Sequence, residues 1–304
     1  MMTAKQGSFF ETSGPMIQHA LEAACQPLFT DQRQILDSAL RYVLCQSGKQ
    51  FRPKLVLASQ GLFSSDFAPM MPVAVALEQV HCFSLVHDDL PAMDDDDLRR
   101  GQPSCHKAFD EATAILTGDA LLSLAYEGLA KDLPAYFSAD KILKAIQCLA
   151  KAIGSQGLIG GQILDMQHTG SISREEDIEM VHQAKTGALI EAALLMPAYL
   201  NEASESQCQA LKEFARHLGL LFQIRDDILD ACASSEELGK TAGKDALQEK
   251  ATYVSLLGLT KAKEKARQEF NHAQTALGAF DPSTSQNLLD CLDRLQYKKQ
   301  ERLF

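Results

Sequence analysis

A dense acidic stretch, His87–Gly101, constrains this chain more than any other feature of its sequence. It reads HDDLPAMDDDDLRRG and holds six aspartates and two arginines in fifteen residues. The apolar run FSLV leads directly into it, although a solvated acidic loop does not normally follow a helix that looks buried. A second group, DDILD at residues 226–230, also ends an apolar helical stretch. We therefore expect the two aspartate groups to face each other and to hold divalent metal ions between them.

The spacing within each group supports this interpretation. Asp88 and Asp94 would point away from each other on a continuous helix, but Pro91 interrupts the helix and lets the chain bulge so that Asp94 returns. Asp226 and Asp230 are four residues apart and share a helix face. Carboxylates this close raise one another's pKa. Hard divalent cations with oxygen ligands remove that conflict, and Mg²⁺ bridging to a substrate phosphate is the usual case.

The composition favours an all-α fold. Of the 304 residues, 46% are hydrophobic, which is ample for a core, and β-branched runs are scarce. The length allows one large domain or two ordinary ones. Because the sequence contains no low-complexity linker, we expect a single domain over residues 1–304 with ten or more helices, and residues 1–13 as a flexible arm.

Charge and cysteine content restrict the partners and the compartment. The net charge of −11 makes nucleic acid or an anionic membrane surface a poor partner. An anionic substrate would need metal ions or local arginines and lysines. The eight cysteines include no C-x-x-C pair, which favours free thiols in a reducing cytosol over a zinc site. No signal-peptide pattern opens the chain, and Glu191 and Pro197 break the longest apolar run. We expect a soluble cytoplasmic protein without stable membrane insertion.

Several cationic side chains have two interpretations each. Lys49 and Arg52 form either an exposed basic turn or, beside a metal-bound phosphate, a diphosphate clamp. Lys185 is either a snorkelling surface lysine or a charge clamp. His81 precedes Asp88 by seven residues and shares its helix face, although a lone histidine is more often structural. The segment Gly239-Lys240-Thr241 lacks P-loop spacing, so we expect a lysine-bearing flap over the metal site instead of an ATP site.

In combination these motifs resemble those of the short-chain trans-isoprenyl diphosphate synthases, and bacterial farnesyl diphosphate synthases in particular. The resemblance covers nearly the whole chain and runs through six motifs in order. They are Gly48-Lys49-x-x-Arg52-Pro53, Asp88-Asp89-x-x-x-x-Asp94 with Leu98-Arg99-Arg100-Gly101, Gly161-Gln162-x-x-Asp165, Lys185-Thr186, Phe222-Gln223-x-x-Asp226-Asp227-x-x-Asp230, and Gly239-Lys240.

The resemblance implies an isoprenoid synthase fold around a central cavity, usually in a homodimer, with Mg²⁺ ions (three in the family, with Mn²⁺ as a substitute). Asp88, Asp94 and Asp226 would hold the ions, supported by Asp89, Asp227 and Asp230. The implied contacts to the allylic diphosphate are Arg99, Lys185, Thr186, Gln223, Lys240 and Lys250. The implied contacts to isopentenyl diphosphate are Lys49, Arg52, His81 and Arg100.

The implied activity is head-to-tail condensation of dimethylallyl or geranyl diphosphate with isopentenyl diphosphate. Phe83 and Ser84, one turn before the first aspartates, would form the floor under the growing chain. A bulky Phe83 favours the C15 product, farnesyl diphosphate, over the C20 alternative, geranylgeranyl diphosphate. The other interpretation of Phe83 is ordinary core packing.

Two features depart from the family pattern. The C-terminal residues 296–304 lack its usual ending, and Lys250 lies one residue off the commonest spacing from Lys240. Three alternative functions fit the sequence less well. A terpene cyclase fits poorly with the DDILD group and with Lys49 and Arg52. A non-catalytic partner subunit would have lost aspartates. A generic acidic calcium-binding protein is the third alternative, and it fails because the aspartates lack EF-hand spacing.

Overall fold

The computed structural model describes residues 9–25, 33–46, 48–168, 174–232, 252–298 and 301–304. The fold is all-α, as the composition predicted, with more than ten helices among these residues. Contacts divide the chain into two compact units. The N-terminal unit comprises Met1–Leu57 and Asp66–Tyr136, and the C-terminal unit comprises Ala58–Ser65 and Phe137–Phe304. The prediction of one domain stays a prediction.

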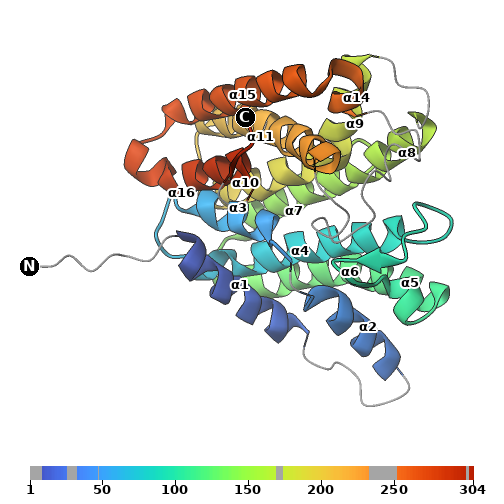
Figure 1. The fold of residues 1–304 in the computed structure, drawn as a ribbon. Helices are drawn as coiled ribbons and strands as arrows, with labels where there is room; N and C mark the ends of the chain where they lie inside the picture. The colour runs from blue at the N-terminus through green and yellow to red at the C-terminus, as the bar shows by residue number, and fades with distance from the viewer. Residues whose placement is uncertain (1–8, 26–32, 47, 169–173, 233–251, 299–300) are drawn as a thin grey trace, which may run out of the picture. The chain divides into compact units, whose positions relative to one another are not determined.

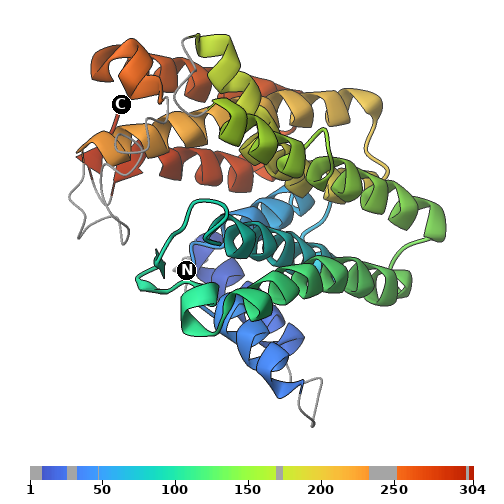
Figure 2. The same ribbon diagram turned by 90° about the vertical axis from the view of Figure 1, so that its right-hand side faces the viewer.

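The N-terminal unit is built on two long helices, α4 (Met71–Asp88) and α6 (Glu111–Asp132), which lie side by side (Figure 2). Asp110 caps α6 by accepting a hydrogen bond from the Thr113 amide at 2.8 Å. The smaller elements are α1 (Phe9–Ala24), α2 (Gln34–Leu44), the start of α3 (Phe51–Gln60), η1 (Ala68–Met70), the hairpin β1 (Leu98–Arg99) and β2 (Gln102–Pro103), α5 (Cys105–Ala108) and η2 (Leu133–Ala135).

Helix α4 is the core helix of the N-terminal unit and carries the first aspartate group at its end. Together with the preceding turn, α4 is long and apolar enough to cross a membrane. However, 67% of its most apolar 18-residue segment is buried inside the protein. Its buried residues occur on every side of the helix, as is typical of a core helix. They are Val73, Ala74, Ala76, Leu77, Glu78, Gln79, Val80, Cys82, Phe83 and Val86.

The C-terminal unit surrounds α10 (Ala188–Leu200), which is buried along almost its whole length. Helix α7 (Ala139–Ile153) packs on it, as does α11 (Glu205–Cys232), which runs alongside α15 (Leu259–Ala276) (Figure 1). The other elements are α8 (Leu158–His168), α9 (Glu175–His182), η3 (Gln183–Gly187), α14 (Tyr253–Leu257), η4 (Leu277–Ala279), α16 (Pro282–Asp293), η5 (Arg294–Gln296), and the hairpin β3 (Tyr297–Lys298) and β4 (Glu301–Arg302).

Two local features differ from the sequence expectation. Helix α1 begins at Phe9, inside the segment expected to be a flexible arm, because Phe9 is buried and its ring meets that of Phe67 at 6.2 Å. Residues 1–8 lie outside the described residues. Between α9 and α10 the helix widens into the π-helical segment η3, a form that often marks functional sites.

Candidate active site

The first aspartate group bulges as the sequence predicted. Helix α4 ends at Asp88, and the backbone amide of Asp94 returns to donate a hydrogen bond to the Asp88 carbonyl at 2.8 Å. Asp95 helps the chain reverse by adopting a left-handed conformation with φ of 48°, which aspartate tolerates better than most residues. The bulge therefore brings the two predicted metal ligands of this unit close together in the backbone.

Asp89 is a buried partner of Arg99. Only 2% of Asp89 is exposed, and the Arg99 Nε donates to both of its carboxylate oxygens at 3.1 Å, with Nη2 bonded to the same group. Arg99 also reaches Asp96 at 3.3 Å. Burial raises the pKa of Asp89, although Arg99 opposes that shift. The roles of Asp89 at a metal and of Arg99 at the allylic diphosphate stay predictions.

Three residues predicted to bind isopentenyl diphosphate gather in the N-terminal unit around Glu78. Arg100 lies 3.6 Å from the Glu78 carboxylate, and Glu78 is 2% exposed. Burial raises the pKa of Glu78, while Arg100 and Arg52 lower it. Burial, followed by the charges of Arg52, Arg100 and Arg99, holds the pKa of His81 well below its usual range. Because His81 is neutral, it can donate one hydrogen bond to a phosphate without adding charge.

The Arg100 guanidinium packs closely against Gly48. A Cβ on Gly48 would lie 2.7 Å from the guanidinium carbon of Arg100, so the first glycine of the motif leaves room for that side chain. The Arg100 backbone is also left-handed, with φ of 54°. Lys49 is exposed beside this glycine, and its carbonyl accepts a hydrogen bond from Lys54 at 2.7 Å. Gly48 was recognised from its motif, but its packing role was not predicted.

The second aspartate group lies in the last turns of α11, and its members have different environments. The Asp226 side chain is 43% exposed, and its Oδ1 accepts from Arg225 at 3.2 Å. Asp227 is buried, and its Oδ2 accepts from the backbone amide of Tyr253 at 2.8 Å. Asp226 and Asp230 share a helix face, as predicted from their spacing. Asp226 is the more accessible to an incoming ion, whereas Asp227 also holds the start of α14.

The predicted allylic diphosphate contacts of the C-terminal unit meet at η3. Lys185 pairs with Asp165 of α8 at 2.7 Å, and the Thr186 hydroxyl donates to Gln223 Oε1 of α11 at 3.4 Å. Gly161 makes this arrangement possible, because a Cβ there would lie 2.3 Å from the Lys185 backbone nitrogen. The structure thus brings Lys185, Thr186 and Gln223 together from separate helices.

Two residues that the sequence analysis missed support this group. The ring of His182 stacks on that of Tyr253, with centroids 5.7 Å apart. His182 precedes Lys185 by three residues, about one turn, and Tyr253 donates its backbone amide to Asp227. Their rings therefore connect the turn that carries Lys185 with the second aspartate group. The sequence signal was faint: a Thr252-x-x-Ser255 capping box that starts α14.

His182 should make the folded chain sensitive to acid. Burial lowers the pKa of His182 from 6.5 to about 4, with Asp165 opposing and Lys185 reinforcing the shift. Below pH 6.5 the unfolded chain gains a proton that the folded chain does not take up until about pH 4. Stability is therefore lost as the pH falls through this window. Between about pH 7 and pH 5, wild type should lose about 2 kcal/mol more unfolding free energy than His182→Gln, as measured by urea denaturation. Equal losses in the two proteins would contradict the assignment.

Of the two predicted chain-length residues, Phe83 lies beside His87, which contacts α6. Phe83 is 7% exposed, and its ring meets that of His87 edge-on at 5.0 Å. His87 in turn bonds the Ile115 carbonyl at 3.0 Å. The Ser84 hydroxyl donates to the His81 carbonyl. Phe83 thus has the surroundings of a core residue, and its role as a floor stays a prediction. Lys240 and Lys250 lie outside the described residues.

Comparison with known proteins agrees with this arrangement. The polyprenyl synthetase family model matches residues 33–286. The chain belongs to the polyprenyl synthetase family. A geranylgeranyl pyrophosphate synthase of chloroplasts from Catharanthus roseus is 43% identical over 264 residues, covering 86% of this chain and 74% of the relative.

Solved structures of the polyprenyl synthetase family resemble the fold closely. An FPP/GFPP synthase from Zymomonas mobilis is 37% identical with a TM-score of 0.83, covering 94% of this chain and 97% of its own. A geranyltransferase from Helicobacter pylori, complexed with magnesium and isoprenyl diphosphate, is 31% identical with a TM-score of 0.86, covering 97% and 99%. This polyprenyl synthetase is therefore a prenyltransferase of isoprenoid biosynthesis that acts on isoprenyl diphosphates.

Proposed function

We propose that the chain condenses isopentenyl diphosphate head to tail with dimethylallyl and geranyl diphosphates. The observation that carries this proposal is the Asp94-to-Asp88 backbone hydrogen bond, which brings the backbones of two aspartates together at the end of a core helix. In the same unit, Arg52 and Arg100 supply two cations suited to diphosphate, and neutral His81 lies close to them. Lys185, with the polar side chains of Thr186 and Gln223, forms a second set of groups suited to diphosphate.

The aspartates fit Mg²⁺. Asp88, Asp94 and Asp226 offer carboxylate oxygens, the donor type that this hard cation prefers. When bound, Mg²⁺ would neutralise the charge that develops on departing diphosphate. The geranyltransferase from Helicobacter pylori, whose structure contains magnesium and isoprenyl diphosphate, supports the assignment.

The reaction we propose proceeds by ionisation. Lys185 and Arg99 stabilise negative charge on the departing diphosphate as the allylic C–O bond breaks. Arg52, Arg100 and neutral His81 hold isopentenyl diphosphate so that its double bond attacks the allylic carbocation. The new C–C bond leaves a cation that loses a proton to the departed diphosphate, which restores a double bond. No side-chain nucleophile is needed, but the reaction requires apolar surroundings that keep water from quenching the cation.

For the main product we propose geranylgeranyl diphosphate (C20), with farnesyl diphosphate (C15) as the second candidate. The C20 assignment is supported by the relative at 43% identity that is named a geranylgeranyl pyrophosphate synthase. The C15 candidate is supported by the bulk of Phe83 just before the first aspartates. Incubation with isopentenyl diphosphate, each allylic starter and Mg²⁺, followed by product analysis, separates the two. No condensation product with any starter would refute the proposed reaction.

Replacing Phe83 with alanine should move the product distribution towards longer chains, by at least one C5 unit. The reason is that a large ring is removed one helical turn before the metal ligands. Products extracted after turnover can be separated by chain length. Phe83→Leu provides a second variant, because loss of a buried Phe costs about 3–5 kcal/mol and Leu retains part of the packing. Phe280→Ala is the matched control, because it removes another buried phenylalanine (8% exposed) that belongs to no predicted site, and it should leave chain length unchanged. An unchanged distribution in both Phe83 variants would show that the floor lies elsewhere.

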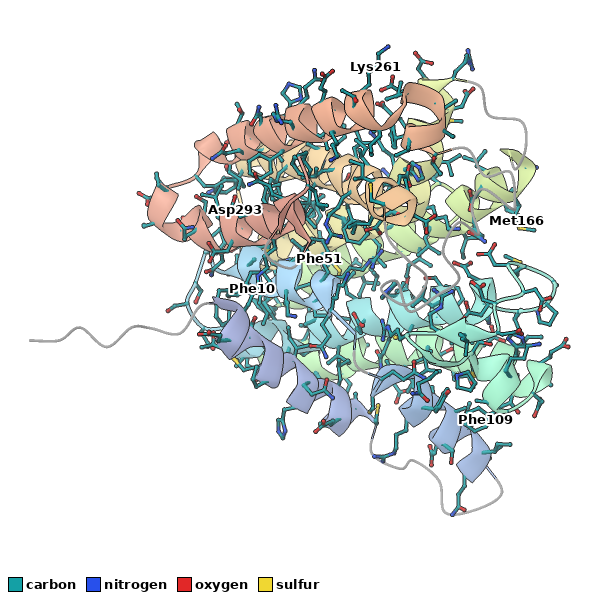
Figure 3. All side chains as sticks on the ribbon, viewed as in Figure 1. Phe10, Phe51, Phe109, Met166, Lys261 and Asp293 are labelled. Carbon is teal, nitrogen blue, oxygen red and sulfur yellow. The ribbon has the colours of Figure 1, made fainter. Side chains whose placement is uncertain are left out.

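We also propose that the chain forms a homodimer. Helix α8 presents a stripe of exposed apolar side chains at helical spacing, Ile159, Ile163 and Met166, which are 43%, 51% and 47% exposed. Figure 3 labels Met166 on this helix. Such a stripe on a helix usually marks an association surface. Sedimentation equilibrium should give twice the mass of the 33.3 kDa chain. A monomer at assay concentrations would count against the proposal.

A further inference from the structure

Two histidines and a glutamate form a compact cluster where α11 packs on α15. His217, Glu269 and His272 each offer a ligand atom, and these atoms all lie within 4.8 Å of one another. The His217 Nδ1 to Glu269 Oε2 distance is 2.6 Å, and the two imidazole rings are 4.9 Å apart. His217 precedes Asp226 by nine residues, about 13 Å along the helix axis, so the cluster is separate from the second aspartate group.

The helices position this cluster in a simple way. Glu269 and His272 are three residues apart on α15, so they project from one face of that helix. His217 meets them from the neighbouring face of α11. His217 and Glu269 are 9% and 6% exposed, whereas His272 is exposed and leaves one side of the cluster open to solvent. A small ion can therefore reach the cluster from solvent.

The donor set selects a class of ion. Two imidazole nitrogens and one carboxylate oxygen match the three protein ligands that commonly hold Zn²⁺ with a water molecule in the fourth position. Imidazole suits Zn²⁺, Ni²⁺, Co²⁺ and Cu²⁺ better than Mg²⁺, which prefers oxygen ligands only. The cluster and the aspartate groups should therefore discriminate between the two kinds of cation.

Two cationic side chains beside the cluster, Arg216 and Lys265, would compete with a metal ion for its ligand atoms. Arg216 lies 2.9 Å from His217 Nε2, and since arginine can only donate, this nitrogen accepts and Nδ1 carries the proton towards Glu269. A metal on Nε2 would displace Arg216, and a metal on Nδ1 would leave a proton on Nε2 facing the guanidinium. Arg216 must leave in both cases, and its side chain is 45% exposed and can do so.

Lys265 competes less with a metal ion for the cluster than Arg216 does. It is held by Glu175 at 2.5 Å and Glu179 at 2.7 Å, and it lies 4.0 Å from Glu269. One Glu269 oxygen is thus only weakly engaged by a cation. From this geometry we propose that His217, Glu269 and His272 form a binding site for a transition-metal ion of the Zn²⁺ class, and that Arg216 is the side chain the ion displaces.

The test is calorimetric titration of the full chain with Zn²⁺, in excess Mg²⁺ to occupy the aspartates and in a Cys232→Ala background to remove the exposed thiol. His272→Ala should weaken binding by at least about tenfold. Because His272 is exposed, its replacement should leave the fold intact. Arg216→Gln should tighten binding, because the competing donor is removed. His19→Ala, an exposed histidine on α1, is the matched control and should bind as the parent does.

Substitution of Co²⁺ provides an independent measurement. Nitrogen and oxygen ligands should give a d–d spectrum without thiolate charge-transfer bands, and that spectrum should be lost in His272→Ala. Thiolate bands, or equal Zn²⁺ affinity in the parent and in His272→Ala, would overturn the proposal. So would Zn²⁺ binding in Arg216→Gln that is no tighter than in the parent.

Discussion

Replacing Asp226 with asparagine lowers kcat/KM for prenyl transfer by roughly 10²–10³-fold if the proposed metal role is correct. The substitution keeps the shape of the side chain and its ability to accept from Arg225 at 3.2 Å, but it removes the charge that binds Mg²⁺. The loss corresponds to about 3–4 kcal/mol of transition-state stabilisation. Steady-state kinetics at several Mg²⁺ concentrations measure both the rate and the apparent metal affinity, and the latter should also weaken.

Asp95→Asn is the matched control for Asp226→Asn. Asp95 is exposed in the loop of the first aspartate group and has a left-handed backbone that asparagine adopts readily, so its replacement should change kcat/KM little. Melting temperatures of both variants should stay close to that of the parent. Equal kinetics for Asp226→Asn and the parent at limiting Mg²⁺ would remove Asp226 from the metal site.

The second large effect is expected from Gly161→Ala. The added methyl group would lie 2.3 Å from the backbone nitrogen of Lys185 and 2.6 Å from its Cα, so α8 and η3 must separate. Overpacking against backbone costs about 1–3 kcal/mol and sometimes more. The displacement also moves Lys185 away from Asp165, so KM for the allylic diphosphate should rise. Thermal unfolding and steady-state kinetics measure the two consequences.

Gly128→Ala tests whether the Gly161 effect reflects close packing. Gly128 lies within α6, and a Cβ there would have no heavy atom within 4 Å. Alanine should therefore stabilise the protein by about 0.5–1 kcal/mol, because it lowers the entropy cost of forming the helix. If Gly161→Ala were as stable as Gly128→Ala, the close approach of α8 to η3 would be wrong.

Sequence reasoning predicted the features that depend on neighbouring residues. The helical composition gave the all-α class, and Pro91 predicted the bulge that returns Asp94 to Asp88. The four-residue spacing of Asp226 and Asp230 placed them on one face of α11. In each case the cause lies within a few residues of its effect, so a local rule is sufficient.

The features that were missed depend on contacts between distant segments. Asp165 meets Lys185 from twenty residues away, and Tyr253 meets Asp227 from twenty-six. The π-helical segment η3 packs closely against α8 at Gly161, and local periodicity carries no sign of that contact. Glu78 reads as one polar residue in an apolar helix until Arg100 is placed beside it. Product length could not be predicted from Phe83 alone, because its neighbours on α6 also shape the space around it.

The ion pairs described above have a consequence for substrate affinity. Arg99, Arg100 and Lys185, three cations proposed to bind diphosphate, each already have a carboxylate partner: Asp89, Glu78 and Asp165 respectively. Diphosphate binding is then an exchange reaction, and its free energy is the difference between two sets of contacts. The internal carboxylates hold the cations in place before the substrate arrives, so little side-chain entropy is lost on binding. They also lower the net affinity, which would allow the diphosphate product to leave.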